Sequence, residues 1–142
     1  MSNLIRLNKV CFVFAVSYVA FILSGTAAAC SLWDVDGGFT VTQDNGYAPV
    51  FNLYQTPQGI ISGSANYEHG AAGFGTTGTV AENSNISGDQ LHVVIQWDNN
   101  TRGSYIGKFN NGKLSGSTCD EKNPGSCAKW TVNNRNFACL RS

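Results

Sequence analysis

Charged residues are scarce in this sequence. Only 13% of its 142 residues are Asp, Glu, Lys or Arg, whereas 42% are hydrophobic, and the formal net charge is zero. This composition excludes the class of chains that stay disordered because they combine low hydrophobicity with high charge. Proteins that bind nucleic acid usually carry a strongly basic face. The charge balance therefore indicates no nucleic-acid partner.

Proline is also scarce, and helical periodicity is missing from residues 30–142. The chain has 3 Pro against 16 Gly. Apolar residues do not recur at the three- and four-residue spacing of an amphipathic helix, whereas short runs of alternating apolar and polar residues are frequent. Glycine suits turns and crowded strand positions. The pattern predicts an all-β domain with many turns.

Motifs of catalysis and metal binding are missing as well. The two histidines, His69 and His92, have no Cys-x-x-Cys or His-x-x-x-His pattern beside them, so zinc binding is not indicated. Residues 73–78 match Gly-x-Gly-x-x-Gly, but a strand-like run follows instead of the helix that a dinucleotide site needs. No serine lies in a Gly-x-Ser-x-Gly elbow. We therefore name no catalytic residue, metal ligand or cofactor.

The first 29 residues have the pattern of a cleaved secretory signal peptide. Arg6 and Lys9 precede an apolar run at residues 10–23, and small residues fill positions 24–29. The apolar run is shorter than the about 20 residues that cross a bilayer. We predict that residues 1–29 are removed. The remaining single domain, residues 30–142, is then secreted to the extracellular space or the periplasm without a membrane anchor.

Four cysteines remain after this cleavage, an even number for an exported domain: Cys30, Cys119, Cys127 and Cys139. Cys119 and Cys127 flank a predicted loop at residues 120–126. Cys30 and Cys139 lie near the two ends of the domain, which meet if a barrel closes. We therefore predict the disulfides Cys119–Cys127 and Cys30–Cys139. A lipoprotein anchored at Cys30 is the alternative, but it would leave one thiol without a partner.

The clearest strands lie at residues 90–97, 103–109 and 113–119. Between the last two, Asn111-Gly112 favours a tight hairpin turn, because both central positions of that turn need positive φ. Alternation within the first two strands predicts which side chains face inward. The predicted inward residues are Leu91, Val93, Ile95 and Trp97 on the first strand, and Tyr105, Gly107 and Phe109 on the second.

Further strands are predicted on both sides of this meander. They lie at residues 31–43, 47–55, 60–67, 76–81 and, last, 128–132 with 137–140; residues 68–75 form a loop, and residues 82–87 extend a strand or form a loop. This makes about eight short strands joined by hairpin-length turns. Such a meander removes its edges by closing on itself. We predict an antiparallel up-and-down β-barrel, with a two-sheet sandwich as the alternative.

Aromatic residues, 11% of the chain, are the best candidates for a binding site. Most large aromatic side chains pack in cores, but a barrel end lined by them would hold a small molecule. Trp97 ends an inward-facing row just before the polar residues 98–101, which indicates a position near a rim. The predicted ligand-binding residues at this barrel mouth are Trp97, Tyr105, Phe109 and Tyr54.

Three short motifs carry a resemblance to known β-barrel domains. They are an early Trp33, Ile95-x-Trp97 at the end of a strand, and Tyr105-x-Gly107 on the next strand. In these the chain resembles small secreted bacterial β-barrel domains and, more remotely, the avidin family. The resemblance implies an eight-stranded barrel in which Trp97 contacts the ligand. The strand at 113–119 lacks the further pocket Trp of avidins, so only Trp97 carries over.

These observations lead to one functional prediction and two alternatives. We predict a secreted binding module that holds a small or extended apolar ligand at the aromatic-lined mouth of a barrel. A secreted domain that binds a protein through its loops, such as a hydrolase inhibitor, is the alternative, and an enzyme is third. An open cavity lined by Trp97 and Tyr105 favours ligand binding, and a filled interior favours protein binding. His69 or His92 beside a carboxylate in a polar cavity favours an enzyme.

Overall fold

The computed structural model describes residues 29–68 and 75–141. The predicted signal peptide up to residue 28, His69 and most of the predicted loop at 68–75 lie outside the described residues. Within these ranges no helix is long and apolar enough to cross a membrane. The strands are β1 (Leu32–Trp33), β2 (Gly37–Thr40), β3 (Thr42–Gln43), β4 (Val50–Gln55), β5 (Ile61–Tyr67), β6 (Thr76–Val80), β7 (Asn85–Ser87), β8 (Gln90–Trp97), β9 (Arg102–Asn110), β10 (Lys113–Asp120), β11 (Asn123–Thr131) and β12 (Cys139–Arg141).

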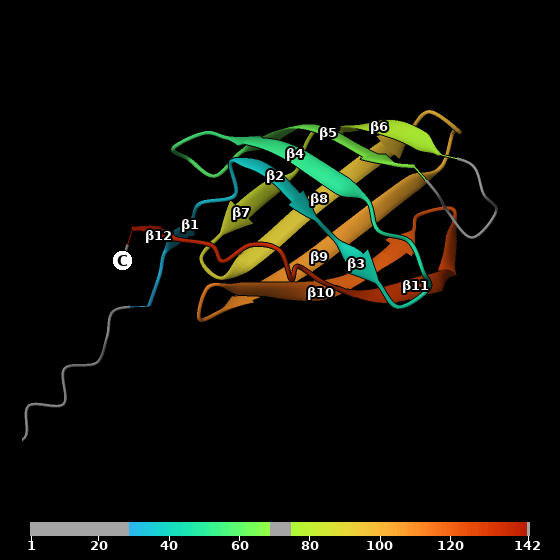
Figure 1. Ribbon diagram of the computed structural model, residues 1–142. Coiled ribbons are helices and arrows are strands. Elements are labelled where there is room, and N and C mark those ends of the chain that lie inside the picture. Colours follow the sequence, from blue (N-terminus) through green and yellow to red (C-terminus); the bar gives the residue numbers. More distant parts are fainter. Residues whose placement is uncertain (1–28, 69–74, 142) are drawn as a thin grey trace, which may run out of the picture.

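The large sheet is an antiparallel meander that curves almost into a closed barrel (Figure 1). Its strand order is β2-β4-β5-β6-β8-β9-β10-β11-β3, and β7 pairs with the start of β8. β2 and β3 belong to one extended segment that is interrupted at Val41. Because β2 pairs with β4 and β3 pairs with β11, this segment joins the two ends of the meander. The predicted antiparallel barrel is confirmed.

One seam of the barrel has no continuous backbone ladder. Residues 132–138 cover it, running between β2 and β10. On the β10 side, the Val132 and Phe137 N–H groups donate to the carbonyl oxygens of Leu114 and Gly112 at 3.0 and 2.9 Å. On the β2 side, a side chain replaces the ladder, since the Thr40 N–H donates to Asn134 Oδ1 at 3.1 Å. A loop therefore covers this seam, which no strand ladder seals.

A second, two-stranded sheet of β1 and β12 lies at one end of the barrel (Figure 1). The predicted strand at 137–140 leaves the barrel here, and only residues from Cys139 on pair with β1. The Cys30–Cys139 disulfide ties the same two segments together, with 5.7 Å between the Cα atoms. This bond uses the Cys30 sulfur, the atom that a lipoprotein anchor would also need.

The second predicted disulfide, Cys119–Cys127, joins directly opposed residues of β10 and β11. The predicted loop between these cysteines is wrong in its length, because β10 extends to Asp120 and β11 begins at Asn123. Asp120 Oδ1 accepts the Lys122 N–H at 2.8 Å and closes a tight turn. Two disulfides fit an extracellular or periplasmic location.

The predicted turn and strand faces in the central hairpins are confirmed. Asn111 and Gly112 have φ values of 49° and 76°. The predicted inward residues of β8 are buried, as are Tyr105 and Phe109 of β9. At Gly107 a Cβ would come within 2.5 Å of the Trp130 ring, so glycine is required where that indole crosses the barrel interior.

Aromatic rings fill the barrel from the β1–β12 end towards its middle. Trp33 stacks on Phe109 with 5.1 Å between ring centroids, and the contacts continue through Phe137, Phe39 and Phe51 to Tyr105. Each of these contacts falls within the range of favourable aromatic pairs. The interior is therefore solid at this end.

Candidate functional site

A cavity of about 230 Å³ opens at the other end of the barrel, where the β8–β9 and β10–β11 turns lie. Its lining comes from six strands, β3, β5, β8, β9, β10 and β11, and from the segments between them. The lining residues are Gln43, Asn45, Tyr47, Pro49, Tyr67, Trp97, Asn99, Thr101, Arg102, Gly103, Tyr105, Thr118, Cys119, Asp120, Ser126 and Ala128.

Three aromatic side chains form one wall of this cavity. Tyr47 meets Tyr67 edge to face with ring centroids 5.3 Å apart, and Tyr67 meets Trp97 in the same manner at 5.1 Å. Trp97 is 6% exposed, so its neighbours hold the indole in place. Burial and the neighbouring Tyr47 raise the pKa of Tyr67, which keeps the phenol neutral. The wall therefore offers an uncharged aromatic surface to a ligand.

The floor of the cavity is polar. Gln43 Nε2 donates a hydrogen bond to the Tyr105 hydroxyl oxygen at 3.2 Å, and the buried side chain of Thr118 also lines the cavity. Burial raises the pKa of Tyr105 to about 12, although its polar neighbours Gln43 and Thr118 act in the opposite direction. The floor is therefore a neutral row of hydrogen-bonding groups at neutral pH.

Strand alternation explains why polar side chains reach the floor. Phe39, Val41 and Gln43 face inward along β2 and β3, and all three are buried. On β10 the inward row ends on Thr118. Inward rows are normally apolar, so a polar residue at the end of such a row marks an interior that is no longer filled. This signal was present in the sequence, and our sequence analysis missed Gln43 and Thr118.

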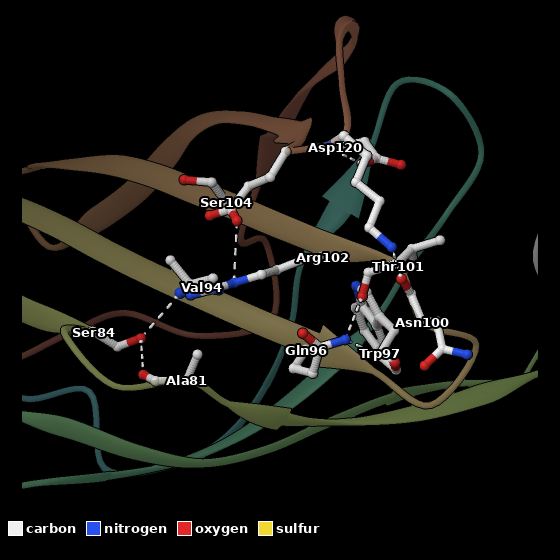
Figure 2. Close-up of polar contacts among 12 residues, drawn as sticks. Ala81, Ser84, Val94, Gln96, Trp97, Asn100, Thr101, Arg102, Ser104 and Asp120 are labelled. Atoms are coloured by element: carbon white, nitrogen blue, oxygen red, sulfur yellow. Dashed lines mark hydrogen bonds and ion pairs between the residues drawn. The ribbon is translucent and has the colours of Figure 1, made fainter.

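Two turns are linked at the rim of the cavity. Arg102 Nε lies 3.1 Å from Glu121 Oε2, and Lys122 Nζ donates to the Asn100 carbonyl oxygen at 2.9 Å. Figure 2 shows Trp97 below this rim, beside Gln96, whose side-chain amide donates to the Thr101 carbonyl oxygen at 3.2 Å. Exposed ion pairs of this kind contribute at most about 1 kcal/mol, so the rim holds the turns together only loosely.

The structure brings together two of the four predicted ligand-binding residues. Trp97 and Tyr105 both line the cavity. Phe109 is buried, but it lies at the opposite end of β9, where it stacks on Trp33. Tyr54 is 69% exposed and faces outward, because its neighbour Leu53 takes the inward position on β4. The prediction of one mouth formed by all four is therefore wrong for Phe109 and Tyr54.

His92 does not meet the condition for an enzyme site. Its ring lies on the outer face of β8, 3.2 Å from Ser104 Oγ, and it is not part of the cavity lining. His69 lies outside the described residues. Among residues 29–68 and 75–141, no cluster of three or more His, Cys, Asp or Glu side chains could hold a metal ion.

The size and lining of the cavity restrict what it can hold. Liquid water occupies about 30 Å³ per molecule, so the volume corresponds to roughly eight waters, or to a molecule of about one substituted ring. The lining offers an aromatic wall on one side and hydroxyl and amide groups on the floor. The lining has two charged residues, Arg102 and Asp120, and their charges have opposite signs. The arrangement suits noncovalent binding of a small neutral molecule.

Comparison of the chain with protein-family models, with curated proteins and with solved structures found no match to any of them.

Proposed function

We propose that this protein is an exported binding module that holds one small molecule in the cavity at the mouth of its barrel. The observation that carries the proposal is the contrast between the two ends of the barrel. One end is filled by stacked aromatic rings, whereas the other opens into a cavity of about 230 Å³ beside Trp97 and Tyr105. Binding sites are typically concave, aromatic-lined and equipped with a few polar groups.

The lining supports a different ligand chemistry from the apolar one expected from the sequence. A fully apolar ligand would displace water from Gln43, Tyr105 and Thr118 and would offer these groups no hydrogen bond in exchange. Burying polar groups without such partners costs free energy. A ligand with a flat apolar face and polar atoms at its inner end satisfies both the wall and the floor. We therefore propose a compact, amphipathic and uncharged ligand.

Mass spectrometry of the natively purified protein tests this proposal directly. We expect the wild-type protein to retain a small molecule, and the Trp97→Ala variant to lose it because the aromatic wall is removed. The matched control is Trp33→Ala, which removes an indole from the filled end of the barrel. Both substitutions should lower the free energy of unfolding, by roughly 3–5 kcal/mol for the buried Trp97 and by less for Trp33, which is only partly buried, but only the first should empty the cavity.

Two results would contradict the proposal. If both variants lost the molecule equally, the cause would be a general loosening of the barrel and not the loss of the aromatic wall. A wild-type protein that retains no molecule and binds none from a library of small neutral compounds would show that the cavity is not a binding site.

A further inference from the structure

Gln43 brings a buried amide group to the mouth cavity. The residue is 9% exposed and lines the cavity. Its Nε2 donates a hydrogen bond to the Tyr105 hydroxyl oxygen at 3.2 Å. This hydrogen bond orients the amide, because it directs the nitrogen to Tyr105. The other polar atom of the amide, Oε1, therefore points in a different direction and needs a partner of its own.

The backbone around Gln43 holds this side chain inside the barrel. The Gln43 N–H donates to the Tyr47 carbonyl oxygen at 2.8 Å, and the Gln43 carbonyl oxygen accepts the Gly46 N–H at 3.3 Å. In the sheet, Gln43 of β3 also lies opposite Trp130 of β11. A tight turn and a strand partner thus fix the direction in which the side chain leaves the backbone.

The Gln43 Oε1 atom is accessible from the cavity. Among residues 29–68 and 75–141, no group donates a hydrogen bond to it, and it does not belong to the buried side-chain atoms that lack a partner. An acceptor without a partner that is not buried in this sense is exposed to solvent. Because Gln43 is otherwise buried and lines the cavity, this exposure is to the cavity.

A carbonyl oxygen selects its partners more strictly than a hydroxyl group does. The hydroxyl groups of Tyr47 and Thr101, which also line the cavity, rotate to donate or to accept. Gln43 Oε1 only accepts. In the ligand-free protein, water supplies the donor. A ligand that displaces this water has to donate a hydrogen bond in its place, since a buried acceptor without a partner costs free energy.

We propose that Gln43 Oε1 anchors the ligand by accepting a hydrogen bond from its O–H or N–H group, and that the ligand is an uncharged ring packed against Tyr47, Tyr67 and Trp97. The inference rests on the proposed function and names the chemistry of its ligand. A carboxylate or phosphate is disfavoured, because it would place acceptors against an oxygen that itself accepts. A ring that carries only an ether or ester oxygen is disfavoured for the same reason.

Phenol is a suitable probe, and anisole and toluene are its matched controls. All three are uncharged benzene rings with one substituent, but phenol donates and accepts hydrogen bonds, anisole only accepts them and toluene does neither. We would titrate each compound into dialysed, ¹³C,¹⁵N-labelled protein and follow the side-chain carbonyl carbons of the glutamines. We expect phenol to bind at least about threefold more tightly than either control.

The carbonyl carbon signals report which glutamine receives the hydrogen bond. Phenol should move the Gln43 signal downfield, as a new hydrogen bond to the attached oxygen requires, and toluene should not. The control signal is that of Gln90, an exposed residue at the start of β8, which should stay in place with all three compounds. This measurement uses the wild-type protein and does not depend on the folding of any variant.

Two variants separate the amide from general effects. Gln43→Met keeps the length of the side chain and removes the acceptor, so toluene should then bind at least as tightly as phenol, whose hydroxyl group loses water without a partner. Gln90→Met is the matched control, because it makes the same replacement at an exposed position opposite Lys108. It should keep the preference for phenol that the wild type shows.

Three outcomes would overturn the anchor. They are anisole binding as tightly as phenol, a Gln43 signal that does not respond to phenol, and a preference for phenol that survives Gln43→Met. The proposed function is judged separately by the molecule retained in native mass spectrometry. A retained molecule that carries no O–H or N–H group would preserve the binding function and reject the anchor.

Discussion

Single polar residues divide the barrel interior into a filled part and an open part. Tyr105 lies at the boundary: its ring meets Phe51 on the filled side, with 5.0 Å between centroids, and its hydroxyl group bonds Gln43 on the open side. A buried tyrosine usually finds a partner for its hydroxyl group. This residue therefore joins the core to the candidate site.

The raised pKa of Tyr105 predicts a loss of stability at alkaline pH. Below pH 10, the folded and unfolded chains both hold the phenolic proton; between 10 and about 12 the unfolded chain loses it first, so the free energy of unfolding falls as pH rises. A shift of this size corresponds to roughly 2–3 kcal/mol. We expect the stability difference between wild type and Tyr105→Phe to shrink by that amount in urea titrations across this range. A constant difference would show that Tyr105 titrates normally.

Ser84 lies in the break between β6 and β7, two strands that both pair with β8. Its side chain stabilises this break. Its hydroxyl group donates to the Ala81 carbonyl oxygen at 2.8 Å and accepts the Val94 N–H at 3.0 Å, as Figure 2 shows. Val94, on the face of β8 that alternation predicts to be outward, is only 4% exposed, because this interruption covers it. The side chain of Ser84 thus takes the place of a missing strand neighbour.

Ser84→Ala should lower the free energy of unfolding by about 1–3 kcal/mol, because it leaves the Val94 N–H buried without a partner. Urea denaturation measures this change. The control is Ser117→Ala on the exposed face of β10, for which we expect a change within about 0.5 kcal/mol. Equal effects of the two substitutions would show that the Ser84 hydroxyl group does not replace the ladder.

At the scale of elements, the seam beside β2 depends on one arginine. The Arg135 guanidinium donates to the Asp36 and Asp34 carbonyl oxygens at 2.6 and 3.2 Å. Its central carbon lies 4.9 Å from the centre of the Phe137 ring, within the distance of a cation–π contact. Arg135 therefore ties the loop at 132–138 to the segment that precedes β2.

Arg135→Lys keeps the charge but loses the planar, forked donor group that reaches two carbonyl oxygens at once. We expect the free energy of unfolding to fall by about 1.5–3 kcal/mol, measured by urea denaturation. Hydrogen exchange should become faster at the Thr40 and Phe137 N–H groups in particular. The control is Lys113→Ala, an exposed residue of β10, and a loss no larger than in this control would contradict the role of Arg135.

At the scale of the whole molecule, the two disulfides hold opposite ends of the barrel. Cys119–Cys127 closes a sequence separation of 8 residues near the mouth, and Cys30–Cys139 closes 109 residues at the filled end. The entropy that a cross-link removes from the unfolded chain grows with the length of the closed loop. The two bonds therefore contribute unequally to stability.

Replacing both cysteines of a pair by serine tests this difference. We expect a loss of about 2.5 kcal/mol for the Cys119–Cys127 pair and about 5 kcal/mol for the Cys30–Cys139 pair, from the loop lengths. Thermal unfolding of the two double variants, each compared with wild type, measures both values. A larger loss for the Cys119–Cys127 pair would show that strand pairing at the mouth matters more than loop length.

The sequence by itself determined the fold class, the disulfide pairing and the central hairpins. The alternation in residues 90–97 and the Asn111-Gly112 turn are local signals. Successive side chains of a strand point to opposite faces wherever the strand lies in the fold. The pairing of the cysteines followed from the closure of a meander. The cleaved signal peptide and the resemblance to avidins stay predictions.

Only the tertiary structure decided which aromatic residues share the mouth. Trp97 and Phe109 are both inward on neighbouring strands, but the hairpin register places Gln96 opposite Arg102 and Gln90 opposite Lys108, so they lie at opposite ends. The seam also depends on a contact between distant segments, that of Arg135 with Asp36. Local patterns specify faces and turns, whereas a cavity depends on which interior positions the packed side chains leave empty.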